Sequence, residues 1–415
     1  RIYQPSLATR VHNKSPEKYL RKIVDVIRSG MGFPAVHFDD THIKMMLAKG
    51  VSIEDARDYC LMGCVEPQKA GKTEGWHDAA FFNMCRPLEF VFSNGMDEGE
   101  QVGPSTGRVE EMASFEAFFE AYQQQMEYCI SLLVNADNAI DTAHAQRCPL
   151  PFLSCLVDDC IKRGKSVQEG GAVYNFTGPQ GFGIANVADS LYAIKQLVFE
   201  EKKVTLAEYK RALALNFGKG FDAVTVGKMA GQVIKELDKA GQKLSAAQVE
   251  EIVKGIATSS LSEEDRSLCD RIYALIEEVP KYGNDIDEVD AFARQVAYTY
   301  TKPLLKYRNP RGGMFQAGLY PVSANVPLGA QTGATPDGRL AHTPVADGVS
   351  PAAGRDVHGP TATANSVSRL DHGIASNGTL LNQKFHPSAL SGEEGLNNFV
   401  ALIRSYFDQK GSHMQ

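Results

Sequence analysis

The sequence predicts an α/β fold in which helices surround a barrel-like sheet of short, buried strands. Two observations favour this class. Helical patterns dominate residues 110–162 and 187–300, whereas segments rich in Gly and Pro with short apolar runs lie between and after them. The stretch 170–181 has the composition of a Gly-rich loop joined to short strands. Helices that alternate with short buried strands are typical of α/β proteins.

The individual elements follow from local signals along the chain. Ser15-Pro16-Glu17 predicts a helix start with Ser as N-cap and Pro at the first helical position. A second helix is expected over 53–61, entered through Ser52, and another over 396–407. The charged stretch 224–285 predicts a peripheral helical insert within a single domain over 1–415. Residues 301–390 lose the helical period, and the long loop 329–359 is typical of a functional segment.

Composition excludes several classes of function. The 415 residues are 43% hydrophobic and 22% charged, with a net charge of −7 and no basic stripe, so we expect no nucleic acid partner. No apolar run approaches the roughly 18 residues that suggest a membrane span, and we expect no membrane partner. The eight cysteines are scattered through a long chain, which indicates a reducing cytoplasm. The short pair Cys60/Cys64 lacks a second pair, so we expect no metal site.

The pentapeptide Gly63-Cys64-Val65-Glu66-Pro67 carries the clearest chemical signal. In an extended loop, residues i and i+2 project to the same side, so the thiol of Cys64 and the carboxylate of Glu66 would face one substrate. A sulfur that takes a hydrogen atom beside a base that takes a proton is the arrangement that a radical lyase needs. We therefore expect Cys64 and Glu66 to be catalytic.

A His-Asp pair follows shortly after this pentapeptide. His77 can carry protons and Asp78 can orient a substrate hydroxyl, although either can equally be a structural polar residue. A Cys–His hydrolase with Cys64 as nucleophile and His77 as base is the non-radical alternative. Glu66 argues against it, because a carboxylate beside the sulfur raises the thiol pKa and disfavours the thiolate.

The sequence resembles the glycyl radical enzymes of the pyruvate formate-lyase superfamily. Five segments that together span most of the chain carry the resemblance. They are Gly63–Pro67, Gly170–Pro179, Val326–Pro351, Gly359–Val367 and Leu380–Phe385.

The resemblance implies a fold and a mechanism. It implies part of a ten-stranded α/β barrel with the cysteine loop at its centre. Cys64 would become a thiyl radical and abstract a substrate hydrogen, while Glu66 would act as general base or relay a proton to the leaving group. A protein-borne glycyl radical would be installed by a partner enzyme that uses S-adenosylmethionine and an iron–sulfur cluster. The family also implies a homodimer, located in the cytoplasm or in a bacterial microcompartment.

The chain departs from the family in one motif. The radical glycine of the family lies in an Arg-Val-Ala-Gly-Tyr motif, which this sequence does not contain. We therefore expect the radical glycine to lie outside this chain, and we expect the chain alone, as a central-to-C-terminal part of a longer protein, to be inactive.

Details of the resemblance suggest the reaction. Gly63 stands where pyruvate formate-lyase has a second cysteine, which argues against acyl transfer. The diol dehydratases carry an Asp at the position of Asp78 and a Tyr-x-Val at Tyr320 and Val322, so we expect these residues and His77 to bind substrate. We therefore expect C–O elimination from a small diol or polyol. Decarboxylation of an arylacetate, C–S cleavage of a sulfonate, a non-radical cysteine enzyme and an inactive scaffold remain as alternatives.

Overall fold

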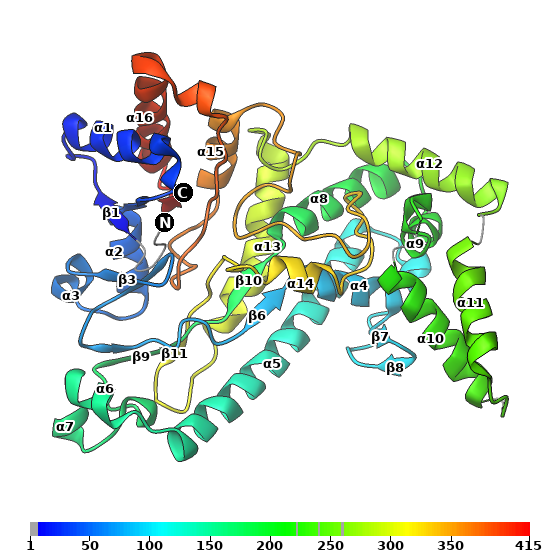
Figure 1. The fold of residues 1–415 in the computed structure, drawn as a ribbon, viewed down its shortest axis with the longest axis horizontal. Helices are drawn as coiled ribbons and strands as arrows, with labels where there is room; N and C mark the ends of the chain where they lie inside the picture. The colour runs from blue at the N-terminus through cyan, green and yellow to red at the C-terminus, as the bar shows by residue number, and fades with distance from the viewer. Residues whose placement is uncertain (1–6, 221–222, 240, 259–260) are drawn as a thin grey trace.

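A computed structural model describes residues 7–220, 223–239, 241–258 and 261–415 (Figure 1). Sixteen α-helices within these residues surround short strands. The helices are α1 (Glu17–Val26), α2 (Asp39–Ala48), α3 (Ile53–Arg57), α4 (Cys85–Ser93), α5 (Phe115–Arg147), α6 (Pro151–Leu156), α7 (Cys160–Arg163), α8 (Ile184–Ile194), α9 (Leu206–Ala214), α10 (Ala223–Lys239), α11 (Ala246–Thr258), α12 (Glu263–Glu278), α13 (Asp287–Leu304), α14 (Asn325–Gly329), α15 (Pro360–Ser368) and α16 (Gly392–Asp408).

The strands of the described residues are short and form five small sheets. The three-stranded sheets have the orders β1-β2-β12 and β11-β9-β5, and the remaining strands pair as β10-β6, β3-β4 and β7-β8. The strands are β1 (Ala8–Val11), β2 (Ala35–Phe38), β3 (Cys60–Met62), β4 (Glu66–Gln68), β5 (Thr73–Glu74), β6 (Phe81–Asn83), β7 (Met96–Asp97), β8 (Glu100–Gln101), β9 (Tyr174–Thr177), β10 (Gln180–Phe182), β11 (Met314–Phe315) and β12 (His413–Met414).

Backbone hydrogen bonds connect most of these pieces into one row. β9 pairs in parallel with β5 on one side and with β11 on the other, and β10 pairs in parallel with β6. The row continues through the parallel bridge Leu319↔Thr379. Shortly after Thr379, the backbone groups of Leu381 and Gln383 form hydrogen bonds with those of Gln415. β12 then pairs with β2, and β2 pairs in parallel with β1. Parallel pairing of segments far apart in sequence confirms the α/β class, and within the described residues the row stays open rather than closing into a barrel.

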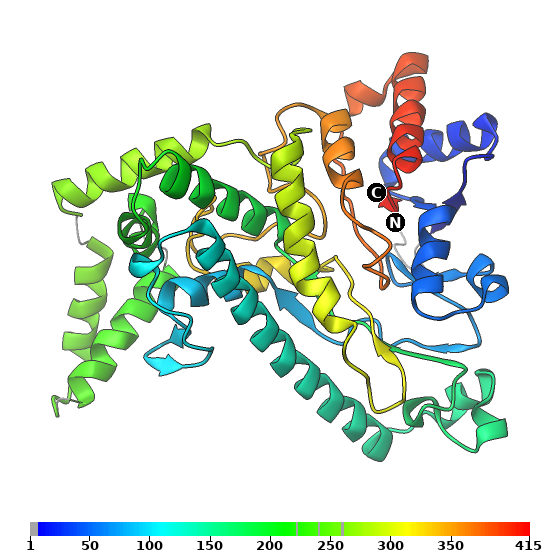
Figure 2. The ribbon, with the colours of Figure 1, turned by 180° about the vertical axis from the view of Figure 1, so that it is seen from behind.

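Helices cover the row and supply the core. All eleven residues of α8 are buried, which fits a helix that is apolar on nearly every face. α8 packs against α13, and α13 and α4 contact the long helix α5 (Figure 2). Arg311 and Asp141 form a buried ion pair that ties α5 to the loop before β11. α1 and α15 pack on α16, beside the sheet that joins both ends of the described chain (Figures 1 and 2).

Two predicted helix boundaries differ from the structure. Pro16 rather than Ser15 is the N-cap residue of α1, and the Ser15 hydroxyl instead accepts a hydrogen bond from the His12 N–H. The helix predicted over 53–61 ends at Arg57, because Cys60–Met62 pairs as β3 with β4. The helix predicted over 396–407 is confirmed as the central part of α16.

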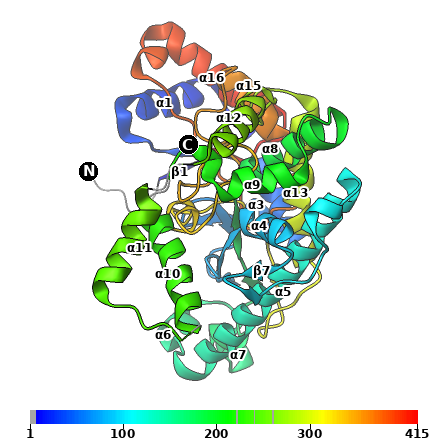
Figure 3. The ribbon, with the colours of Figure 1, turned by 90° about the vertical axis from the view of Figure 1, so that its right-hand side faces the viewer.

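The segment predicted as a peripheral insert contains α10, α11 and α12. Figure 3 faces the edge of the molecule that carries α10 and α11. α12 is different, because its residues Cys269, Ile272 and Ile276 belong to the main hydrophobic core. Residues 221–222, 240 and 259–260 lie outside the described part of the chain, and an insert over 224–285 stays a prediction.

Candidate active site

Cys64 lies at the tip of a tight hairpin. β3 and β4 pair antiparallel with Met62 opposite Glu66, which leaves Gly63, Cys64 and Val65 as the turn. Gly63 has φ +68°, a left-handed conformation that favours Gly. The Cys64 side chain is exposed at this tip, where another group can reach its sulfur.

The carboxylate of Glu66 folds back beneath this turn. Its Oε2 accepts hydrogen bonds from the N–H groups of Cys64 at 2.7 Å and Val65 at 2.6 Å. A Cβ on residue 63 would lie 3.0 Å from Oε1, so Gly at this position makes room for the carboxylate. Cys64 and Glu66 are close together, as predicted. The predicted geometry was wrong, because the two residues sit on a closed turn rather than on one side of an extended loop.

The protonation of this pair suits radical chemistry. Burial, together with the nearby carboxylates of Glu66 and Asp78, raises the pKa of Cys64 to about 11. At neutral pH Cys64 is therefore a thiol, which carries a transferable hydrogen atom. Burial also raises the pKa of Glu66 to about 7, although the backbone N–H groups oppose this shift. Glu66 can thus exchange a proton near neutral pH.

Asp78 stands near the Cys64–Glu66 turn. The side-chain amide of Gln180, which is fully buried, donates hydrogen bonds to Asp78 Oδ1 and to the carbonyl of His77. Burial raises the pKa of Asp78, and Gln180 opposes this by bonding to the carboxylate. The exposed Asp78 carboxylate is therefore held in one direction beside the thiol.

Tyr320 lies on the inner side of the turn. It is buried against Val65 and Leu380. Its hydroxyl donates to the His77 carbonyl at 3.2 Å and accepts a hydrogen bond from Asn377 Nδ2 at 2.9 Å. Burial raises the pKa of Tyr320, and the carboxylates of Glu66 and Asp78 raise it further. Four of the six predicted site residues, Cys64, Glu66, Asp78 and Tyr320, are thus close together.

The ring of His77 is enclosed by protein. Nδ1 lies 2.5 Å from Oδ1 of Asn377, and Nε2 lies 3.2 Å from Oε1 of Gln68. Burial and the nearby Lys49 lower the pKa of His77 to about 3, so the ring is neutral. Its carbonyl also accepts hydrogen bonds from Gln180, Asn377 and Tyr320. This arrangement favours a supporting position for His77 over the predicted substrate contact.

Val322 lies apart from the hydrogen-bonded residues of the site. Its side chain is 54% exposed, and its backbone has φ +54°, which is unusual for a β-branched residue. Pro321, between Tyr320 and Val322, begins a turn in which its carbonyl accepts from the Ala324 N–H at 2.8 Å. Substrate contact by Val322 stays a prediction.

The sequence did not point to Gln180, Asn377 or Lys49. Asn377 joins three segments through one buried amide, because it bonds to His77, Tyr320 and Gly178. The dipeptide Asn377-Gly378 is a turn signal that could have drawn attention to this position. Gln180 directly follows the Gly178-Pro179 turn, but nothing local distinguishes it as a partner of Asp78.

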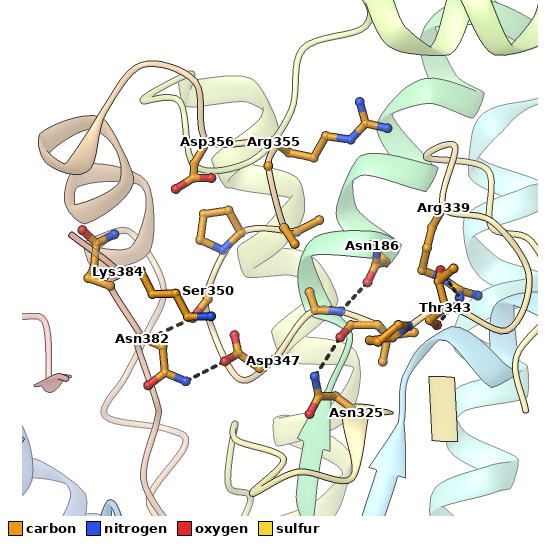
Figure 4. A pocket seen from close by; sticks show the side chains of 18 of the residues that line it. Asn186, Asn325, Arg339, Thr343, Asp347, Ser350, Arg355, Asp356, Asn382 and Lys384 are labelled. Atoms are coloured by element: carbon orange, nitrogen blue, oxygen red, sulfur yellow. Dashed lines mark hydrogen bonds between the residues drawn. The ribbon is translucent and has the colours of Figure 1, made fainter. Parts of the chain in front are cut away.

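A pocket of about 940 Å³ lies away from this site, between the loop 337–360 and residues 382–389 (Figure 4). Hydrogen bonds connect the residues that line this pocket. Asn186 accepts from the Ala346 N–H, Asn325 donates to the Val345 carbonyl, and Asn382 donates to Asp347. None of the six predicted site residues lines it, so its size does not mark the site of chemistry.

The described residues contain no group of three or more His, Cys, Asp or Glu side chains placed to hold a metal ion. Among their helices, none combines the length and hydropathy needed to cross a bilayer.

Sequence comparison identifies two family matches. The family described as Pyruvate formate lyase-like matches residues 1–329, and the family described as Glycine radical matches residues 345–415. Among curated proteins, (2S)-3-sulfopropanediol dehydratase of Klebsiella oxytoca is 36% identical over 100% of this chain and 45% of its own length. The chain thus spans about half the length of the curated relatives it matches.

Solved structures share the fold over nearly the whole chain. A structure from a study of 1,2-propanediol dehydration in Roseburia inulinivorans is 61% identical with a TM-score of 0.95, covering 99% of this chain and 49% of that one. The glycerol-bound B12-independent glycerol dehydratase of Clostridium butyricum is 50% identical with a TM-score of 0.86, covering 99% of this chain and 46% of that one. The predicted fold is therefore confirmed as that of these enzymes.

Proposed function

Because the chain belongs to the pyruvate formate lyase-like family, we propose that the protein containing it is a glycyl radical lyase that removes water from a small diol. The observation that carries this proposal is the Cys64–Glu66 turn. It holds a neutral thiol at an exposed tip above a buried carboxyl group that titrates near pH 7.

The residues of the site can share the reaction as follows. The Cys64 thiol would give its hydrogen atom to a glycyl radical stored elsewhere in the protein, which would leave a thiyl radical on the Cys64 sulfur. The Cys64 sulfur then takes a hydrogen atom from a substrate carbon that bears a hydroxyl group. Glu66 receives the proton of that hydroxyl and passes it to the adjacent hydroxyl, which leaves as water. Cys64 finally returns its hydrogen atom to the product radical, so the net change is loss of water.

Asp78 and Tyr320 complete the site in this proposal. The carboxylate of Asp78, oriented by Gln180, accepts a hydrogen bond from a substrate hydroxyl. Tyr320 forms the inner wall beside Glu66. The carbonyl of His77 holds Tyr320 in place by accepting a hydrogen bond from its hydroxyl. These positions align the departing hydroxyl with the radical carbon, which is how oriented polar groups lower such a barrier.

A diol is favoured over the other substrates that the resemblance raised. The two structures described above come from a study of 1,2-propanediol dehydration and from a glycerol-bound glycerol dehydratase, and they are 61% and 50% identical to this chain. We further propose that the protein works as a cytoplasmic homodimer and is activated by a radical S-adenosylmethionine enzyme.

The test is turnover by the full-length protein after anaerobic activation, with 1,2-propanediol and glycerol offered as substrates. Wild type is expected to form the corresponding aldehydes, and Cys64→Ser is expected to form none. Cys155→Ser, at another exposed cysteine, is the matched control and should keep activity. Full activity in Cys64→Ser would refute the mechanism. Turnover of an arylacetate or a sulfonate in place of a diol would refute the assignment of substrate class.

A further inference from the structure

Lys49 is a buried cation behind the cysteine loop. It follows α2, and its side chain is only 4% exposed. Its ammonium group donates to the carbonyl of Pro67 at 2.7 Å and lies 5.0 Å from the centre of the Phe176 ring. Among the described residues no carboxylate lies within 4 Å of it to form an ion pair. Burying a charge with so few partners is unfavourable, so a packing role alone does not explain a lysine here.

The place of Lys49 relates it to Glu66. Pro67 is the residue directly after Glu66 on β4, so the hydrogen bond from Lys49 attaches to the strand that carries the carboxylate. Lys49 and Glu66 also attract each other electrostatically through a poorly solvated region. A positive charge near a carboxyl group favours the ionised form of that group.

We propose that Lys49 is a positioning residue of the active site, whose buried ammonium group fixes β4 through the Pro67 carbonyl and favours the carboxylate form of Glu66. The inference rests on the function proposed above, in which Glu66 must accept a proton. Lys49 acts through Glu66 and touches no reacting atom.

The other titratable groups near the pair are accounted for. Glu66 faces Cys64 on its own turn, Asp78 after β5 and Tyr320 after β11. Lys49 additionally faces the rings of His42 and His77. Asp78 favours the protonated form of Glu66, and both histidine rings are neutral. Lys49 is therefore the one cation among these groups that opposes the effect of burial on Glu66.

The energetics of the buried ammonium group separate this role from a structural one. Burial lowers the pKa of Lys49 to about 7, which shows that the surroundings disfavour its charge. Replacement by Met keeps the apolar stem and removes the buried charge, which offsets the loss of the hydrogen bond to Pro67. Thermal melting of this variant separates a loss of function from a loss of stability.

The experiment compares Lys49→Met and Lys49→Arg in the full-length, activated protein. The control is Lys44→Met, which removes an exposed lysine of α2 that pairs with Asp371. Lys49→Met is expected to move the acidic limb of the kcat/KM profile to higher pH by about one unit, which is about a tenfold loss on that limb that is recovered as the pH rises. Lys49→Arg, which keeps the charge, and Lys44→Met are expected to keep the wild-type profile.

An infrared titration gives a second readout that requires no turnover. The band of the protonated Glu66 carboxyl is identified by its loss in Glu66→Gln, and in Lys49→Met it is expected to persist to higher pH by the same amount. If this shift is seen without diol turnover in wild type, the proposed function fails and the role of Lys49 stands. An unshifted titration and profile in Lys49→Met would overturn the inference. So would a uniform loss of activity at every pH, or a Lys49→Arg variant that shifts as Lys49→Met does.

Discussion

Glu66 serves two purposes with one carboxyl group. Oε2 closes the turn by accepting hydrogen bonds from the N–H groups of Cys64 and Val65. Burial raises the pKa of the same carboxyl group to about 7. Burial holds Cys64 as a thiol, and the carboxylate of Glu66 adds to this effect because negative charge beside sulfur opposes thiolate formation. Structure and chemistry therefore depend on the same atoms at this residue.

Glu66→Gln should separate these two purposes. The Gln carbonyl can still accept both N–H groups, so the turn should persist, but the side chain can no longer take a proton. We expect turnover to fall by about 10²- to 10⁴-fold, the usual loss when an acid–base group is removed. The thiol pKa of Cys64 should also fall, which the pH dependence of its alkylation rate would measure. An unchanged turnover rate would show that Glu66 only shapes the turn.

Cys64 and Glu66 could be predicted because the thiol and the carboxylate lie within one stretch of five consecutive residues. Their partners could not, because Gln180 meets Asp78 across 102 positions of sequence and Asn377 meets His77 across 300. A single sequence carries no sign of such pairings. Local signals worked where local physics decides, as in the helix over 396–407. They failed at 58–61, where pairing of β3 with β4 overrides the helical pattern.

At the scale of elements, the hairpin β3–β4 is held from behind by the turn at Gly378. This residue has φ +104°, and a Cβ there would lie 2.4 Å from the carbonyl oxygen of Val65. The backbone after Asn377 thus packs directly against the cysteine loop with no room for a side chain.

Gly378→Ala should therefore damage both stability and activity. Gly99→Ala is the matched control, because Gly99 has φ +85° with nothing within 4 Å of a Cβ. Both variants pay about 1–2 kcal/mol for a left-handed Ala. Gly378→Ala should cost a further 1–3 kcal/mol, roughly, for overpacking and should lower kcat by displacing Cys64. Thermal melting and turnover of both variants check this, and equal effects would contradict the close contact.

The sheet β1-β2-β12 contains two buried histidines, His37 and His413, and His37 also packs against the buried His42 of α2. Protonation of these three histidines should loosen the sheet. Burial lowers the pKa of His42 to about 4 and of His413 to about 3, and it also lowers the pKa of His37. The unfolded strands bind more protons than the folded ones below about pH 6.5, so stability is present above that pH and is lost as the pH falls. Each histidine contributes at most about 1.4 kcal/mol per pH unit.

Hydrogen exchange can locate this effect. Peptides that cover 35–42 and 410–415 should exchange faster at pH 5 than at pH 7, after correction for the intrinsic rate. Peptides from α8 and α13, which contain no histidine, should not become less protected. Uniform protection of the sheet at both values of pH would contradict the assigned pKa shifts.

At the scale of the whole molecule, one row of strands joins segments from residue 8 to residue 415, whereas α10 and α11 stand outside it. The two ends of the segment that carries α10 and α11 lie close together, since a Cβ at Gly218 would lie 3.2 Å from Leu261 Cδ1. A short linker can therefore replace this segment without moving the core.

Replacing 223–258 with a short Gly/Ser linker should leave the active site intact. We expect kcat to stay within about twofold of wild type, because no described site residue comes from this segment and surface insertions are well tolerated. Turnover of the full-length protein measures it. A large loss of activity would show that 223–258 is more than a peripheral segment.

The most direct test of the account is an anaerobic electron paramagnetic resonance spectrum of the full-length protein after treatment with its activating enzyme and S-adenosylmethionine. We predict a glycyl doublet in wild type and in Cys64→Ser, with diol consumed only by wild type. No doublet, with an activating enzyme that works on a control protein, would contradict the claim that Cys64 carries hydrogen atoms for a stored radical.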